Sequence, residues 1–190
     1  MLHSILLQIA KNSILSHLGV AYKPDKEKLL HEYPFLTKDG ATFVTLHKSG
    51  ALRGCIGSIV AHQNLLEDLI SNAHSAAFRD PRFSPVSVHE LAQLHLEVSV
   101  LSQPELIEYQ NYEDLCTKIE PAKDGLILKH GYYQGTFLPQ VWHELPSVES
   151  FLEHLSIKAG ANPAIYKEHP MIYKYRVDAI EEDFDAILPL

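Results

Sequence analysis

The sequence predicts an α+β fold in which a mainly antiparallel sheet is flanked by helices. Its 190 residues suffice for one domain, or for one domain built from two small lobes. Hydrophobic residues make up 46% of the chain, at a mean hydropathy of −0.08, which is enough for a sizeable core. The extended segments come in hairpin-like pairs separated by helical patterns, without the strict βαβ alternation of a parallel sheet.

Apolar residues at helical spacing predict several amphipathic helices. A first helix covers residues 2–18 and ends at Gly19. The clearest helix begins at Asn64, where Glu67 three residues later completes a capping-box pattern, and continues to Phe78. Four further helical segments are expected at residues 26–31, 88–94, 112–119 and 148–159.

Alternating and β-branched runs predict the strands. The strongest signal is a hairpin, with one strand starting at Ala41 and a second strand reaching Val60 after a turn at residues 48–50. Leu94–Leu101 alternates apolar and polar residues, which is typical of a half-buried strand. The acidic segment 181–185 is predicted to be a solvated chain end. Three further strands are expected at residues 125–129, 134–138 and 171–177.

Net charge and cysteine content narrow the function classes. The formal net charge of −8 argues against nucleic acid or an anionic membrane as the main partner. No apolar stretch approaches the roughly 20 residues that cross a bilayer, and the N-terminal run lacks the basic residues of a signal peptide. Cys55 and Cys116 are too few for a disulfide framework, so the sequence predicts a cytoplasmic protein.

Common cofactor motifs are missing from the sequence. Gly54 and Gly57 lack the spacing of a phosphate-binding loop or a dinucleotide fingerprint. Twelve histidines invite a metal interpretation, but His89 and His143 each lack a second histidine four residues further on. We therefore assign no metal ligand and no cofactor from the sequence, although scattered histidines could still converge in the fold.

The hairpin register decides which side chains share a face. A three-residue loop at residues 48–50 with a bulge would pair His47 with Ala51 and Leu46 with Leu52. A loop of two residues would mix apolar and polar side chains on each face, so we predict the bulged, three-residue form. The face turned away from the core then carries five side chains, namely Phe43, Thr45, His47, Arg53 and Cys55.

Cys55 and Arg53 are the leading candidates for a catalytic site. The two residues are two positions apart in one strand, so their side chains point to the same face of the sheet. The guanidinium of Arg53 would then favour the thiolate form of Cys55 and make it a nucleophile. Gly54 and Gly57 leave room beside it for a ligand, and His47 is a further substrate-binding candidate. The alternative has equal weight: Cys55 is a small buried hydrophobe and the glycines serve a bend or tight helix packing.

Three charged residues complete the candidate set. Glu97 is a polar residue in an otherwise apolar strand, which predicts either a general base in a cleft or a salt bridge to Arg53 or Arg82. Asp80 and Arg82, in the proline-bounded loop after the helix ending at residue 78, could bind an anionic group or stabilise the loop by pairing. Cys116 belongs to an apolar helical pattern and is predicted to be inert.

Several of these segments resemble the AMMECR domain family, whose prokaryotic members are called AmmeMemoRadiSam system protein A. The similarity covers nearly the whole chain, so residues 1–190 are expected to form a single domain of this family. The matching segments follow the expected order. They are Thr42-Phe43-Val44-Thr45-Leu46, Leu52-Arg53-Gly54-Cys55-Ile56-Gly57-Ser58, residues 75–83, Glu97-Val98-Ser99-Val100-Leu101 and residues 135–141.

The resemblance implies a compact α+β fold of two lobes with a cleft near residues 52–58. The family's prokaryotic genes tend to accompany those of a Memo-type protein, similar to extradiol dioxygenases, and of a radical S-adenosylmethionine enzyme. A component of a protein or small-molecule modification system is therefore expected, and thiol-based catalysis at Cys55 is the enzyme hypothesis. The alternative is a non-catalytic adaptor that binds those partners.

Overall fold

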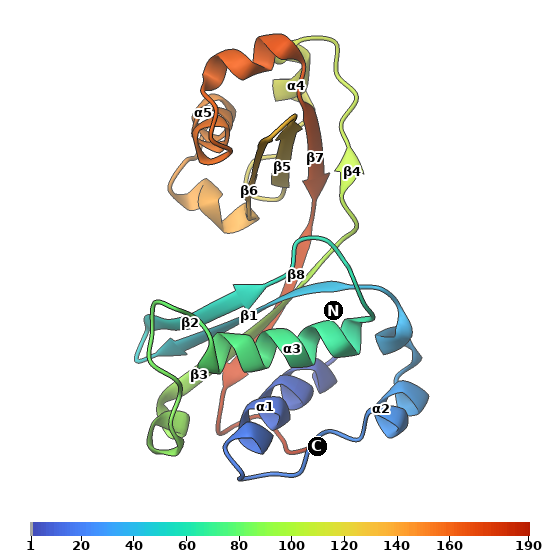
Figure 1. The fold of residues 1–190 in the computed structure, drawn as a ribbon, viewed down its shortest axis with the longest axis vertical. Helices are drawn as coiled ribbons and strands as arrows, with labels where there is room; N and C mark the ends of the chain where they lie inside the picture. Colours follow the sequence, from blue (N-terminus) through green and yellow to red (C-terminus); the bar gives the residue numbers. More distant parts are fainter. Residues whose placement is uncertain (1) are drawn as a thin grey trace. The chain divides into compact units, whose positions relative to one another are not determined.

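The computed structural model describes residues 2–190, and Figure 1 shows the arrangement of their helices and strands. The chain forms two compact units. Unit 1 contains the residues up to Leu101 together with Asp178–Leu190, and unit 2 contains Ser102–Val177. Helices and a four-stranded, antiparallel-paired sheet occur in both, which confirms the predicted α+β class.

Unit 1 contains α1 (Ile5–His17), α2 (Lys26–Glu32), α3 (Leu65–Phe78), β1 (Ala41–Lys48), β2 (Ala51–Gly57), β3 (Leu94–Leu101), nearly all of β8 (Val177–Asp183) and the 3₁₀ helices η1 (Pro34–Thr37) and η2 (Val88–Gln93). The strand order of its sheet is β2-β1-β3-β8, and β1 pairs antiparallel with both β2 and β3. Buried side chains of α1, α3 and the strands form one hydrophobic core, so these helices cover one face of the sheet.

Unit 2 contains α4 (Tyr112–Thr117), α5 (Val148–Lys158), β4 (Glu105–Leu106), β5 (Gly125–His130), β6 (Tyr133–Phe137), β7 (Met171–Tyr175) and the 3₁₀ helices η3 (Pro139–His143) and η4 (Pro163–Glu168). Its sheet has the order β4-β7-β5-β6. The core of this unit includes Trp142 and Phe151, whose rings stack with centroids 3.8 Å apart.

Local capping chemistry explains where the long helices begin and end. The Asn64 side chain accepts a hydrogen bond from the backbone N–H of Glu67 at 2.9 Å, which satisfies one free donor at the start of α3. Gly19 and Gly160 follow α1 and α5 with φ of +73° and +87°, a left-handed conformation that favours glycine. The predicted helices at these positions are confirmed, and β3 has the predicted bounds.

The loop of the β1–β2 hairpin differs from our prediction. It has two residues, Ser49 and Gly50, whose φ angles of +51° and +81° are both positive, as a type I′ turn requires. His47 consequently pairs with Leu52, and the predicted pairing of His47 with Ala51 is wrong. The two-residue turn is favoured because its twist matches that of the two strands.

A bulge does exist, but in β2 and not in the loop. The register shifts at Arg53, so that Leu46 lies opposite Gly54 and Thr45 lies opposite Cys55. One extra residue in β2 thus restores the separation of apolar and polar side chains that a plain two-residue hairpin would lose.

The acidic side chains of segment 181–185 are solvated, as predicted, but the segment is not a free chain end. Residues 181–183 form the end of β8, which lies next to β3, and Phe184 is 1% exposed in the core of unit 1. The backbone N–H of Phe184 donates to the carbonyl of Leu94 at 2.9 Å. The strand was hidden in the sequence because its acidic side chains are largely exposed, while its backbone joins the sheet.

The glycines of β2 are explained by packing. A Cβ atom on Gly54 would lie 2.1 Å from the carbonyl oxygen of Ala76, so the backbone of α3 approaches the strand directly. A Cβ atom on Gly57 would lie 2.3 Å from the ring of Phe43, which covers this glycine from the neighbouring strand. Tight helix packing therefore accounts for Gly54.

We expect Gly54→Val to lower the free energy of unfolding by about 3 kcal/mol or more, because the new side chain would overlap the backbone of α3. Ala51→Val is the matched control, since Ala51 is exposed at the mouth of the hairpin. Urea unfolding followed by circular dichroism measures both variants. Equal losses of stability would contradict the packing argument.

Candidate functional site

Three side chains form a row across the sheet of unit 1. Thr45 on β1 lies opposite Cys55 on β2 and opposite Glu97 on β3. The Thr45 hydroxyl donates a hydrogen bond to Cys55 Sγ at 3.3 Å. We call the surface that carries Phe43, Thr45, His47, Cys55 and Glu97 the Cys55 face; Val44, Leu46 and Val98, which alternate with these residues, point into the core.

The backbone of Cys55 is held by the loop after α3. Asp80, 4% exposed, accepts a hydrogen bond from the backbone N–H of Cys55 at 2.9 Å. Arg82 binds Asp80 through Nε and Nη2, at 2.9 and 2.7 Å, and donates to the carbonyl of Cys55 at 3.3 Å. The hydrogen bonds from Arg82 hold the pKa of Asp80 well below its usual range, which keeps this carboxylate charged. The loop pair thus fixes both polar backbone groups of the candidate nucleophile.

The guanidinium of Arg53 is bound to a buried carboxylate, that of Glu90. Its Nε and Nη2 atoms donate to the two carboxylate oxygens of Glu90 at 3.0 and 2.9 Å. Lys48 reaches the same carboxylate at 3.0 Å, and the backbone N–H of Ser87 donates to it at 2.9 Å. The bulge therefore places Arg53 in an ion-pair network.

Burial and hydrogen bonding act in opposite directions on Glu90. Burial by itself would raise the pKa of this carboxyl, but the hydrogen bonds from Arg53, Ser87 and Lys48 outweigh it and lower the pKa to about 2. The carboxylate is consequently charged at every pH at which the protein would normally be studied. The remaining nitrogen of Arg53, Nη1, is buried and has no hydrogen-bond partner within residues 2–190.

The structure separates the predicted site residues into two groups. Cys55 and Glu97 share the Cys55 face with His47, which lies two residues from Thr45 on β1. Asp80 and Arg82 contact the backbone of Cys55 from the loop. The second group consists of residues with other roles: Gly54 faces α3, Gly57 lies under Phe43, and Arg53 is bound to Glu90.

Sequence reasoning missed the roles of two residues of the site. The sequence placed Thr45 on the same face as Cys55, but only the observed register shows that the two residues lie directly opposite each other. Glu90 carries a local signal, since Ser87 and Glu90 form a capping box at the start of η2. Nothing in the sequence near Glu90 points to Arg53, because the two residues meet only through the fold.

Cys116, the second cysteine, belongs to unit 2. It lies in α4, and burial raises the pKa of its thiol. The nearby carboxylate of Glu149 also disfavours a thiolate there. These surroundings agree with the expectation that Cys116 is inert.

Between residues 2 and 190, no group of three or more His, Cys, Asp or Glu side chains is placed to hold a metal ion. None of the helices in that range has both the length and the apolar character needed to span a bilayer.

These features define a class: an α+β protein of two units that carries a free thiol, fixed at its backbone, on a sheet face. The chain belongs to the AMMECR1 family, whose model matches residues 7–180. This confirms the resemblance seen in the motifs.

Individual relatives support the assignment. A protein of Methanocaldococcus jannaschii is 40% identical over 167 residues, covering 85% of this chain and 83% of the relative. A protein of Methanothermobacter thermautotrophicus is 41% identical over 182 residues, covering 94% and 93%. The crystal structure of an uncharacterized protein from Pyrococcus horikoshii is similar with a TM-score of 0.80 and 37% sequence identity, covering 95% of this chain and 91% of that one.

The Glu90 network predicts a pH-dependent stability. Glu90→Gln is expected to cost about 3 kcal/mol at pH 7, because it leaves the buried guanidinium of Arg53 without its counter-charge. A carboxyl whose pKa is lowered on folding, here from 4.5 to about 2, contributes stability above pH 4.5 and loses it as the pH falls towards 2.

The difference between wild type and Glu90→Gln should therefore shrink between pH 4.5 and 2. Urea unfolding at a series of pH values measures it. Glu27→Gln is the control, since Glu27 is exposed on α2. A difference that stays constant over this range would show that the charge of Glu90 does not stabilise the fold.

Proposed function

We propose that this protein is a component of a protein or small-molecule modification system that acts with a Memo-like protein and a radical S-adenosylmethionine enzyme, and that the Cys55 face is its working surface. The observation that carries this proposal is the row of Cys55, Thr45 and Glu97, with the backbone of Cys55 fixed by Asp80 and Arg82. Family membership supports the choice of partners. A cytoplasmic location belongs to the proposal, since both cysteines are free thiols, as is usual in a reducing compartment.

The row supplies the groups that thiol chemistry needs. Cys55 is the nucleophile, and the hydroxyl of Thr45, which donates to its sulfur at 3.3 Å, orients it. Glu97 is the general base that takes a proton from a substrate bound along the row. Because neighbouring strands lie about 4.8 Å apart, the backbones of Cys55 and Glu97 are separated by about 10 Å. The side chain of Thr45 stands between them, so a substrate that reaches both groups would lie over Thr45.

The other predicted residues hold the reacting groups in place and take no direct part in the chemistry. Asp80 and Arg82 hold the thiol-bearing backbone, and Arg53 with Glu90 holds the bulge that follows the hairpin turn. His47 lies two residues from Thr45 on the same face, where it can contact a substrate.

Alkylation by iodoacetamide at neutral pH tests the enzyme hypothesis. Cys55 is expected to react at least about tenfold faster than Cys116, because burial raises the pKa of Cys116 and so reduces its thiolate fraction. Mass spectrometry of the labelled peptides gives both rates. Faster labelling of Cys116, or labelling of neither thiol before unfolding, would contradict a reactive Cys55.

A matched pair of variants tests the part played by Thr45. Thr45→Val removes the hydroxyl bound to Cys55 and should slow the labelling of Cys55, whereas Thr117→Val removes a hydroxyl that bonds locally in α4 and should leave it unchanged. Equal rates in the two variants would remove Thr45 from the site.

The second candidate function is a non-catalytic adaptor that binds the same two partners. It is favoured by the ion pair of Arg53, whose charge is directed to Glu90, and by the neutral hydroxyl that contacts the thiol. In this function the Cys55 face is a binding surface and the thiol itself is dispensable.

Partner capture separates the two functions. If the protein is an adaptor, Glu97→Lys should weaken capture of the Memo-like or radical enzyme by about tenfold, because it reverses a charge on the binding face, and Cys55→Ser should have no effect. If it is an enzyme, Cys55→Ser should abolish the modification while capture persists. Arg53→Glu is unsuitable as a probe, because it would place two carboxylates together at Glu90.

A further inference from the structure

Unit 1 contains a cavity of about 450 Å³ that is lined by basic and hydroxyl groups. It lies where the second half of α1, the middle and end of α3, and the segment leading into α2 come together. Its three permanent cations are Lys23, Lys26 and Arg79. No carboxylate belongs to its lining as described, although the chain as a whole has a net charge of −8. A local concentration of positive charge against this average needs an explanation.

Two of the three cations are available to a ligand. In the part of the chain described, no carboxylate lies within ion-pair distance of Lys23 or Arg79, and both side chains are exposed. Lys26 is bound to Glu67 at 2.7 Å, with both side chains more than one-third exposed. An exposed pair of this kind is weak, so Lys26 can turn to an anion at little cost.

The neutral donors of the cavity complement these cations. Ser71 and Ser75 are four residues apart on α3 and so share one face of the helix, and neither hydroxyl has a hydrogen-bond partner within residues 2–190. His74 Nε2 lies 3.1 Å from His17 Nδ1, so one ring must donate to the other. Burial, with a smaller contribution from the neighbouring His17 and Arg79, lowers the pKa of His74.

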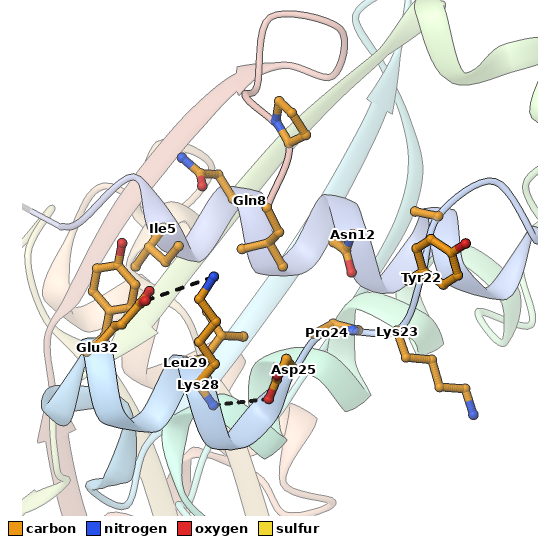
Figure 2. A pocket seen from close by; sticks show the side chains of 14 residues that line it. Ile5, Gln8, Asn12, Tyr22, Lys23, Pro24, Asp25, Lys28, Leu29 and Glu32 are labelled. Atoms are coloured by element: carbon orange, nitrogen blue, oxygen red, sulfur yellow. Dashed lines mark hydrogen bonds and ion pairs between the residues drawn. The ribbon is translucent and has the colours of Figure 1, made fainter.

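The neighbouring cavity provides a contrast within the same unit. This cavity has a volume of about 430 Å³. Figure 2 shows the side chains that line it, which come mainly from α1 and α2. Its lining contains Asp25 and Glu32 beside Lys23 and Lys28, so acidic and basic side chains are equal in number. Glu32 lies 4.0 Å from the ammonium group of Lys28, and Asp25 accepts a hydrogen bond from the backbone N–H of Lys28. Lys23 borders both cavities, and in Figure 2 its side chain extends away from α1 and α2.

We infer that the basic cavity binds the phosphate group of a small molecule. A phosphate dianion accepts hydrogen bonds and donates few, which matches a lining of ammonium, guanidinium and free hydroxyl groups. The volume lies within the range of small-molecule sites, and Ile70 and Pro24 provide an apolar wall for an organic portion. This site is formed by different residues from the Cys55 face and does not rest on the function proposed for that face.

Isothermal titration calorimetry of the full chain with three probes tests the inference. Pyrophosphate, glycerol 3-phosphate and inorganic phosphate carry the required group, and glycerol is the uncharged control. Binding of the phosphate compounds without binding of glycerol supports the site. Tighter binding of glycerol 3-phosphate than of inorganic phosphate identifies an organic phosphate as the ligand, and equal binding identifies free phosphate.

Variants show whether binding occurs in this cavity. Arg79→Gln and Lys23→Gln should each weaken binding by about tenfold, which is the effect of losing one charge-assisted hydrogen bond. Lys28→Gln is the matched control, because Lys28 lies on α2 but lines the neighbouring cavity. Circular dichroism checks that each variant is folded. Absence of binding by wild type, or equal weakening by Lys28→Gln and Arg79→Gln, overturns the inference.

Discussion

The contact between Gly54 and the backbone of α3 sets the position of everything around Cys55. Because no side chain separates them, the carbonyl of Ala76 lies directly against β2, and α3 ends two residues later. The loop that follows therefore starts beside this strand, where Asp80 reaches the backbone N–H of Cys55 and Arg82 reaches its carbonyl. The tight packing of one glycine is thus the condition for the geometry of the candidate site.

The bulge in β2 reconciles two demands of the hairpin. The two-residue turn fits the twist of the strands, but by itself it would place polar and apolar side chains on the same face. The extra residue, Arg53, restores the alternation and brings Thr45 opposite Cys55. It also needs a partner for its own charge, and the buried carboxylate of Glu90 provides one. The row of side chains and the ion pair beside it therefore have a common origin.

Features determined by near neighbours in the chain could be predicted, and features determined by pairing could not. The cap and apolar spacing of α3 and the alternation of β3 are local, so their bounds follow from the sequence. The register of β1 with β2 depends on the turn conformation, and β8 depends on a strand more than 70 residues away. Within the site, Cys55 and Asp80 were recognisable as candidates. The links from Thr45 to Cys55 and from Glu90 to Arg53 required the fold.

The hydrogen bonds from Asp80 and Arg82 to the backbone of Cys55 also affect whether molecules of this protein associate through their sheets. β2 is an edge strand, and a bare edge invites strands of other molecules to extend the sheet, which leads to aggregation. Asp80 and Arg82 occupy the outward N–H and carbonyl of Cys55, near the middle of that edge. Since the hydrogen bonds from Arg82 keep the pKa of Asp80 low, Asp80 remains charged in mildly acidic solution and continues to occupy the N–H of Cys55 on this edge. The side chains that fix the thiol also keep the sheet from growing into its neighbours.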